Sequence, residues 1–138
     1  MKVIIQPGRL CGTLKVPPSK SFAHRALICA ALADGASRIS DCGQSEDVKA
    51  TLSCLRALGA VFEQTGDALA VKKGEPEAGI LDCGESGSTL RFMLPVAMAL
   101  GGEYVFKGRG RLMIGTEDMP ELTGLSFELH EAEPLQLG

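Results

Sequence analysis

Four side chains that could bind an anion lie within six residues near the start of the chain. They are Lys20, Ser21, His24 and Arg25. Ser21 and Arg25 are four positions apart, so they share one face of a helix. A helix capped by Ser19 would direct its free N–H groups and the positive end of its dipole toward these cations. The spacing therefore predicts an anion site at a helix N-terminus.

The same residues also have an ordinary explanation. Lys and Arg at a helix start are usually solvated surface residues, and a histidine such as His24 is more often packed than a ligand. The charge pattern favours the anion site, because cations usually stand at helix C-termini and two here oppose the dipole. Every residue from Ala26 to Ala33 is apolar, which predicts a helix buried on all sides.

A glycine-rich turn, Asp82-Cys83-Gly84-Glu85-Ser86-Gly87-Ser88-Thr89, forms a second candidate site. A strand at Ile80–Leu81 leads into it and an apolar helix follows it, which suits the approach of backbone N–H groups to an anion. The turn has neither the phosphate-loop nor the dinucleotide spacing. Pro95 predicts a kink or a delayed regular start in the helix that follows.

A third candidate is Lys107-Gly108-Arg109-Gly110-Arg111, which places three cations on a flexible turn. A charge run of this kind is usually solvated, so this motif alone is weak evidence for a ligand.

The elements that would position these motifs form a repeat. Strands are expected at 2–6, 9–16 and 36–40, helices at 19–33 and 45–58, and a hairpin at 61–63 and 68–72. Arg25, Gly35 and Ile39 recur 66 positions later as Arg91, Gly101 and Val105, and the last strand pair recurs at 127–130 and 135–137. This predicts an α/β (α+β) fold of helix-strand-helix-strand-strand units. Gly115 and Pro120 predict a loop or broken turn at 114–121 in the second unit.

Composition excludes several classes of protein. The 138 residues carry a net charge of −3 and are 4% aromatic, which argues against a nucleic-acid-binding surface. The five cysteines are odd in number and scattered, which argues against a disulfide framework or a zinc site and for the cytoplasm. No signal peptide or apolar run of membrane-spanning length is evident, so no membrane partner is expected.

The three motifs together resemble the first part of the 5-enolpyruvylshikimate-3-phosphate synthases (3-phosphoshikimate 1-carboxyvinyltransferases). The resemblance rests on Pro17-Pro18-Ser19-Lys20-Ser21 with Arg25, the 82–89 turn with Arg91, and Gly110-Arg111-Leu112-Met113. It implies transfer of the enolpyruvyl group of phosphoenolpyruvate to the 5-hydroxyl of shikimate 3-phosphate, with release of phosphate, in aromatic amino acid biosynthesis. It implies no cofactor and no metal. The family fold has two globes of repeat units, with helices inside and sheets outside.

The resemblance also implies roles for six substrate-binding residues. Lys20 resembles a lysine that contacts both substrates, and Ser21 and Arg25 resemble a pair that holds shikimate 3-phosphate. Gly87 resembles the glycine against which phosphoenolpyruvate sits, a position that governs glyphosate binding. Arg111 resembles an arginine on phosphoenolpyruvate, and Arg91 a supporting arginine. No catalytic acid or base is assigned to this chain.

We expect 1–138 to be part of one such domain. Strands in 1–16 would pair with the second globe, 17–74 would form repeat unit 1, and 78–138 would form repeat unit 2, atypical after 113. The chain is expected to be an N-terminal fragment that has no turnover alone and whose natural packing partner is the missing C-terminal globe. The alternative is a non-catalytic anion-binding module or a defunct remnant. A UDP-sugar enolpyruvyl transferase is disfavoured, because 19–21 and Arg25 replace its Lys-Asn motif and no cysteine lies near Arg111.

Overall fold

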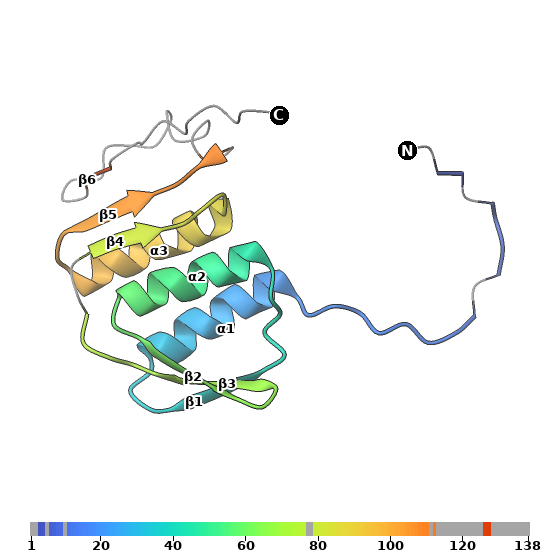
Figure 1. The fold of residues 1–138 in the computed structure, drawn as a ribbon, viewed down its shortest axis with the longest axis horizontal. Helices are drawn as coiled ribbons and strands as arrows, with labels where there is room; N and C mark the ends of the chain where they lie inside the picture. Colours follow the sequence, from blue (N-terminus) through green and yellow to red (C-terminus); the bar gives the residue numbers. More distant parts are fainter. Residues whose placement is uncertain are drawn as a thin grey trace, which may run out of the picture.

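Three helices run alongside one another with a small sheet on either side of them (Figure 1). The computed structural model describes residues 3–4, 6–9, 11–76, 79–110, 112 and 126–127. The helices are α1 (Lys20–Leu32), α2 (Glu46–Ala57) and α3 (Gly87–Leu100). This mixed fold, with helices inside and sheets outside, confirms the predicted class.

The first sheet contains β1 (Ser37–Ser40), β2 (Val61–Thr65) and β3 (Ala68–Lys72) in the order β1-β3-β2. All of its pairs are antiparallel, and Phe62 of β2 lies opposite Val71 of β3. The predicted hairpin is therefore present, although β2 extends two residues further than expected. The sheet packs against α1.

The second sheet is parallel and contains β4 (Gly79–Asp82), β5 (Tyr104–Lys107) and β6 (Ser126–Phe127) in that order. Helix α3 connects β4 to β5, as a parallel pair requires a crossover connection. Because β4 leads directly into α3, this βαβ arrangement places the glycine-rich turn at the carboxyl end of β4 and the N-terminus of α3.

Each helix begins with a serine cap. The hydroxyl oxygens of Ser19, Ser45 and Ser86 accept hydrogen bonds from the backbone N–H groups of Phe22 at 3.3 Å, Val48 at 3.3 Å and Thr89 at 3.1 Å. A serine at this position satisfies one of the N–H groups that a helix leaves without an internal partner. The starts predicted at Ser19 and Ser45 are confirmed.

One apolar core joins the helices to both sheets. Its largest fully buried members come from five different elements: Leu27, Leu55, Leu81, Met93 and Tyr104. Within the described ranges, no helix is long and apolar enough to cross a membrane.

Three expectations about local structure differ in their outcome. The described residues of 2–6 and 9–16 form no strand with other described residues, and their expected pairing with a second globe stays a prediction. The prediction that helix α1 is buried on all sides was wrong, because Cys29 and Leu32 are exposed. Helix α3 begins at Gly87 and contains Pro95, so the start is not delayed, and the alternative of a kink at Pro95 stays a prediction.

Several other predictions lie outside the described residues. They concern Arg111, the broken turn at 114–121, the strand at 135–137 and the part of the 127–130 strand that follows β6.

Candidate functional site

The N-terminal ends of the three helices lie together at one end of the molecule. Nζ of Lys20 in the first turn of α1 lies 2.5 Å from Oδ2 of Asp47 in the first turn of α2. The hydroxyl of Thr89, in the first turn of α3, donates to the backbone oxygen of Asp47 at 3.2 Å. The positive dipole ends of all three helices therefore gather at one place, which favours the binding of an anion there.

The structure brings Ser21 and Arg25 together, as the sequence predicted. Nη1 of Arg25 donates to the backbone oxygen of Ser21 at 2.8 Å and to its hydroxyl at 2.5 Å. The guanidinium also lies 5.0 Å from the centre of the Phe92 ring, on α3. These contacts hold an exposed cation across the gap between α1 and α3. Arg91, the residue before Phe92, is exposed on the same helix.

The glycine-rich turn is tied to the turn that follows β5. The backbone N–H of Cys83 donates to the oxygen of Lys107, and that of Arg109 to the oxygen of Gly84, each at 2.8 Å. Gly84 has φ of +57°, a conformation that favours glycine, and its N–H donates to Oδ1 of Asp82 at 2.8 Å. The second and third sequence motifs are therefore neighbours, which the sequence alone did not indicate.

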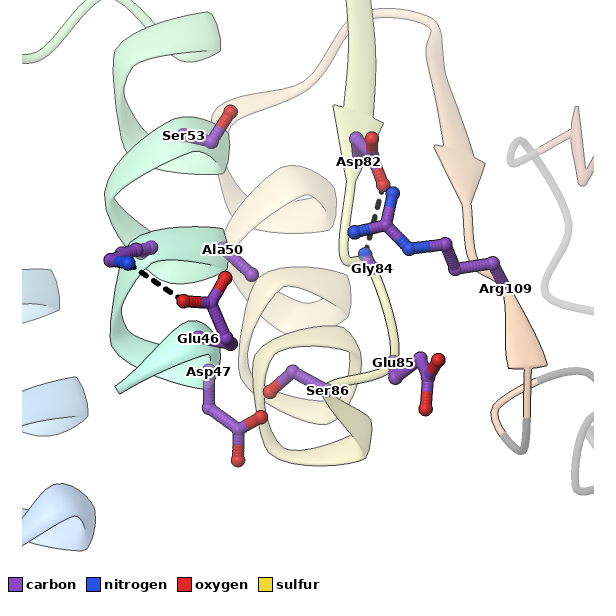
Figure 2. A pocket seen from close by; sticks show the side chains of 10 residues that line it. Glu46, Asp47, Ala50, Ser53, Asp82, Gly84, Glu85, Ser86 and Arg109 are labelled. Carbon is purple, nitrogen blue, oxygen red and sulfur yellow. Dashed lines mark hydrogen bonds and ion pairs between the residues drawn. The ribbon is translucent and has the colours of Figure 1, made fainter. Parts of the chain in front are cut away.

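An open pocket of about 610 Å³ lies between the first turns of α2 and the glycine-rich turn. Figure 2 shows the Arg109 side chain crossing from the β5 side toward Gly84 and Asp82. The lining is mainly polar: Glu46, Asp47, Lys49, Ala50, Ser53, Asp82, Gly84, Glu85, Ser86 and Arg109. Its four carboxylates outnumber its two cations, so the pocket itself does not have the charge of an anion site.

The predicted anion-binding residues lie beside this pocket. Lys20 reaches it through its contact with Asp47, and Gly87 directly follows the lining residue Ser86. Ser21, Arg25 and Arg91 are not part of the lining. The site that the structure assembles is thus the end surface formed by the three helix starts, with the pocket along one side of it.

One electrostatic expectation needs correction. The charge pattern favoured an anion site because two cations oppose the helix dipole, but the carboxylate of Asp47 already pairs with one of them, Lys20. An acidic residue in the first turn of a helix usually serves only to complement the dipole, so nothing in the sequence linked Asp47 to Lys20. Sequence reasoning missed Asp47 as a residue of this region, and it did not predict that Arg109 of the third motif lies beside Gly84.

His24 lies fully inside the protein beneath these groups, at 1% exposure. Burial lowers the pKa of its imidazole below the usual 6.5, Asp47 partly opposes this shift, and Lys20 and Arg25 add to the lowering. The folded chain therefore binds a proton at this imidazole less readily than the unfolded chain does.

This difference predicts a pH dependence of stability. As the pH falls through 6.5, the unfolded state gains a proton that the folded state does not, so the free energy of unfolding decreases until the folded-state pKa is passed. Urea unfolding at about pH 7.5 and about pH 5.5 measures the decrease. A His24→Asn chain has no imidazole at this position and should lose less stability over the same interval. An equal loss in both chains would assign the effect to other groups.

No group of three or more side chains suitable for holding a metal occurs among the described residues. All five cysteines are free, although Sγ of Cys54 and Sγ of Cys83 lie only 4.0 Å apart in the core. Sequence spacing suggested that the cysteines are scattered, and it could not show this contact between α2 and the glycine-rich turn.

Taken together, the fold and the site define an α/β protein in which three capped helix starts and several cations meet at one end. Residues 4–113 match the model of the EPSP synthase (3-phosphoshikimate 1-carboxyvinyltransferase) family. The match spans most of the chain, and the chain belongs to this family.

Individual proteins of this family also match the chain. The chain is 44% identical over 121 residues to the 3-phosphoshikimate 1-carboxyvinyltransferase of Clostridioides difficile, which covers 78% of this chain and 28% of that protein. It is 43% identical over 116 residues to the protein of the same name from Clostridium botulinum (strain Alaska E43 / Type E3), covering 78% and 27%. The solved EPSP synthase from Acinetobacter baumannii superposes with a TM-score of 0.66 at 26% identity, covering 74% of this chain and 24% of that one. The chain thus spans little more than a quarter of the length of these curated relatives.

Proposed function

We propose that this chain forms the amino-terminal part of a 3-phosphoshikimate 1-carboxyvinyltransferase that works in the cytoplasm. The reaction transfers the enolpyruvyl group of phosphoenolpyruvate to the 5-hydroxyl of shikimate 3-phosphate and releases phosphate. Family membership supports the reaction. The observation that carries the role of this chain is the convergence of three capped helix N-termini at Lys20 and the Ser86–Gly87 turn.

In this proposal, the chain's task is to bind and orient two polyanions. Arg25, already oriented by Ser21 and Phe92, donates charge-assisted hydrogen bonds to shikimate 3-phosphate together with the Ser21 hydroxyl. Lys20 contacts both substrates, while Asp47 keeps its ammonium group directed toward the site. Arg91 and Arg111 add positive charge on the side of phosphoenolpyruvate.

Titration of the ¹⁵N-labelled chain with shikimate 3-phosphate tests this function. Two or more charge-assisted contacts should give a dissociation constant of about 1 mM or lower. We expect the amide shifts to be concentrated at 20–25 and 84–91. Inorganic phosphate, titrated in parallel, is the control for a general anion-binding module. Equal shifts with both ligands, or shifts away from these residues, would contradict the proposal.

Gly87→Ala separates ligand binding from folding. A Cβ at this first residue of α3 would have Leu112 Cδ1, at 3.8 Å, as its nearest neighbour, so the fold has room for it. We expect the free energy of unfolding to stay the same or rise by about 0.4–1 kcal/mol. The affinity for phosphoenolpyruvate should fall about tenfold, because the methyl group occupies space that the ligand needs.

The measurement for Gly87→Ala is a titration with phosphoenolpyruvate beside a urea denaturation curve. Gly35→Ala is the matched control, because a Cβ at Gly35 meets no atom within 4 Å and lies away from the helix starts. Unchanged phosphoenolpyruvate affinity in Gly87→Ala would remove Gly87 from the proposed site.

A further inference from the structure

A chain of buried hydroxyl groups connects the first two turns of the three helices beneath the cations. Nδ1 of His24 lies 2.7 Å from Oγ1 of Thr51, which in turn lies 2.8 Å from Oγ1 of Thr89. The Thr89 hydroxyl also lies 2.7 Å from Oγ of Ser86 and 3.2 Å from the backbone oxygen of Asp47. His24, Thr51, Thr89 and Ser86 are each at most 2% exposed. Water therefore does not compete for these bonds.

The geometry determines the direction of the two hydrogen bonds that the Thr51 hydroxyl makes. The Thr89 hydroxyl has a single proton, which it donates either to the backbone oxygen of Asp47 or to Oγ of Ser86. In either case the proton between Thr51 and Thr89 must come from the Thr51 hydroxyl. With its own proton committed, Thr51 can only accept from His24.

His24 is consequently the neutral tautomer with its proton on Nδ1. Its Nε2 is buried without a hydrogen-bond partner. An N–H at Nε2 would be a buried donor with nothing to donate to, so the unprotonated nitrogen suits this position better. With this assignment, each hydrogen bond from His24 through Thr51 to Thr89 has one proton to form it.

We propose that His24 is a positioning residue for the substrate site, because it completes the hydroxyl chain that fixes the helix starts relative to one another. The inference rests on the proposed function. The chain holds the backbone of Asp47, whose carboxylate holds Lys20, and it holds Ser86, which precedes Gly87. His24 contacts neither substrate. It positions the groups that do.

The first test is spectroscopic and uses the unmodified chain. Two-bond ¹H–¹⁵N correlation spectra distinguish the two neutral imidazole tautomers and the protonated ring. At about pH 7 we expect His24 to be neutral with the proton on Nδ1. A proton on Nε2, or a charged ring, would overturn the proposal whatever the variants do.

The second test compares variants in shikimate 3-phosphate titrations. His24→Leu leaves the Thr51 oxygen without its donor, and we expect affinity to fall about five- to tenfold. His24→Asn has an amide donor attached where Nδ1 is attached in histidine, and affinity should return to within about twofold of the original. Leu27→Val is the control, because it disturbs the packing of the same helix without touching the hydroxyl chain.

Equal weakening by His24→Leu and Leu27→Val, or no recovery in His24→Asn, would show that His24 only stabilises the fold. A failure of the proposed function would give a different result from a failure of the role of His24. An unmodified chain that binds no shikimate 3-phosphate contradicts both ideas, whereas an Nε2–H tautomer in a chain that does bind contradicts the role of His24 alone.

Discussion

Arg25→Ala is expected to weaken the binding of shikimate 3-phosphate at least tenfold. The guanidinium is oriented before any ligand arrives, by Ser21 on its own helix and by the ring of Phe92 on α3. A pre-oriented donor loses little side-chain freedom on binding, so most of its interaction contributes to affinity. Removing one charge-assisted contact should cost about 1.5–3 kcal/mol, which corresponds to a tenfold or larger loss.

The measurement is an amide-shift titration, with Arg38→Ala as the matched control. Arg38 is an exposed cation on β1, outside the cluster of helix starts, and its loss changes the net charge equally. If both variants bind alike, the attraction comes from overall charge and the site is misplaced.

Lys20→Ala should weaken binding further still, because it leaves the carboxylate of Asp47 without its partner beside the anion.

The sequence predicted elements well where local signals act alone. Ser19 and Ser45 are strong caps, and they begin α1 and α2 in the structure. Turn residues at 65–67 located the hairpin, although they could not fix the length of β2. The strands expected at 9–16 stay a prediction, because a strand depends on a partner elsewhere, and the partner expected for them is a second globe.

The site was predicted only in part, for a related reason. Ser21 and Arg25 are four residues apart in one helix, so their contact follows from helical geometry. The pairing of Lys20 with Asp47 joins residues 27 positions apart on two helices. That contact depends on how α1 packs against α2, which no local pattern encodes. The division of the chain into two repeat units stays a prediction.

The buried position of His24 illustrates the same limit. Its place in the polar first turns of α1 suggested a surface or packed residue, but the two partners that explain it are threonines. Thr51 and Thr89 look unremarkable in the sequence, and each becomes a hydrogen-bonding residue only when α2 and α3 face α1. Buried polar networks of this kind are specified by tertiary packing, and each member needs all the others.

Gly59→Ala is expected to lower the free energy of unfolding by about 2–5 kcal/mol, which is the largest effect of any alanine substitution at a described glycine. Gly59 ends α2 with φ of +92°, and two bonds close the helix there: Gly59 N–H to the oxygen of Arg56 and Ala60 N–H to that of Leu55, each at 2.9 Å. A Cβ at Gly59 would lie 2.0 Å from the backbone oxygen of Glu75. Alanine must therefore adopt a strained conformation and also displace the segment that follows β3.

Two other glycines separate these contributions in urea denaturation. Gly66, in the β2–β3 turn, has φ of +62° with open space around it, so Gly66→Ala measures backbone strain alone, at about 1–2 kcal/mol. Gly35 has neither a positive φ nor a neighbour within 4 Å, so Gly35→Ala should stay within about 0.5 kcal/mol of the original chain. If Gly59→Ala loses no more stability than Gly66→Ala, then the close approach of Glu75 contributes nothing and strain at the end of α2 explains the whole effect. The expected order, with Gly59→Ala well beyond Gly66→Ala, would mean that the segment after β3 packs directly on the end of α2. It would thereby help to fix the helix whose other end presents Asp47 to Lys20.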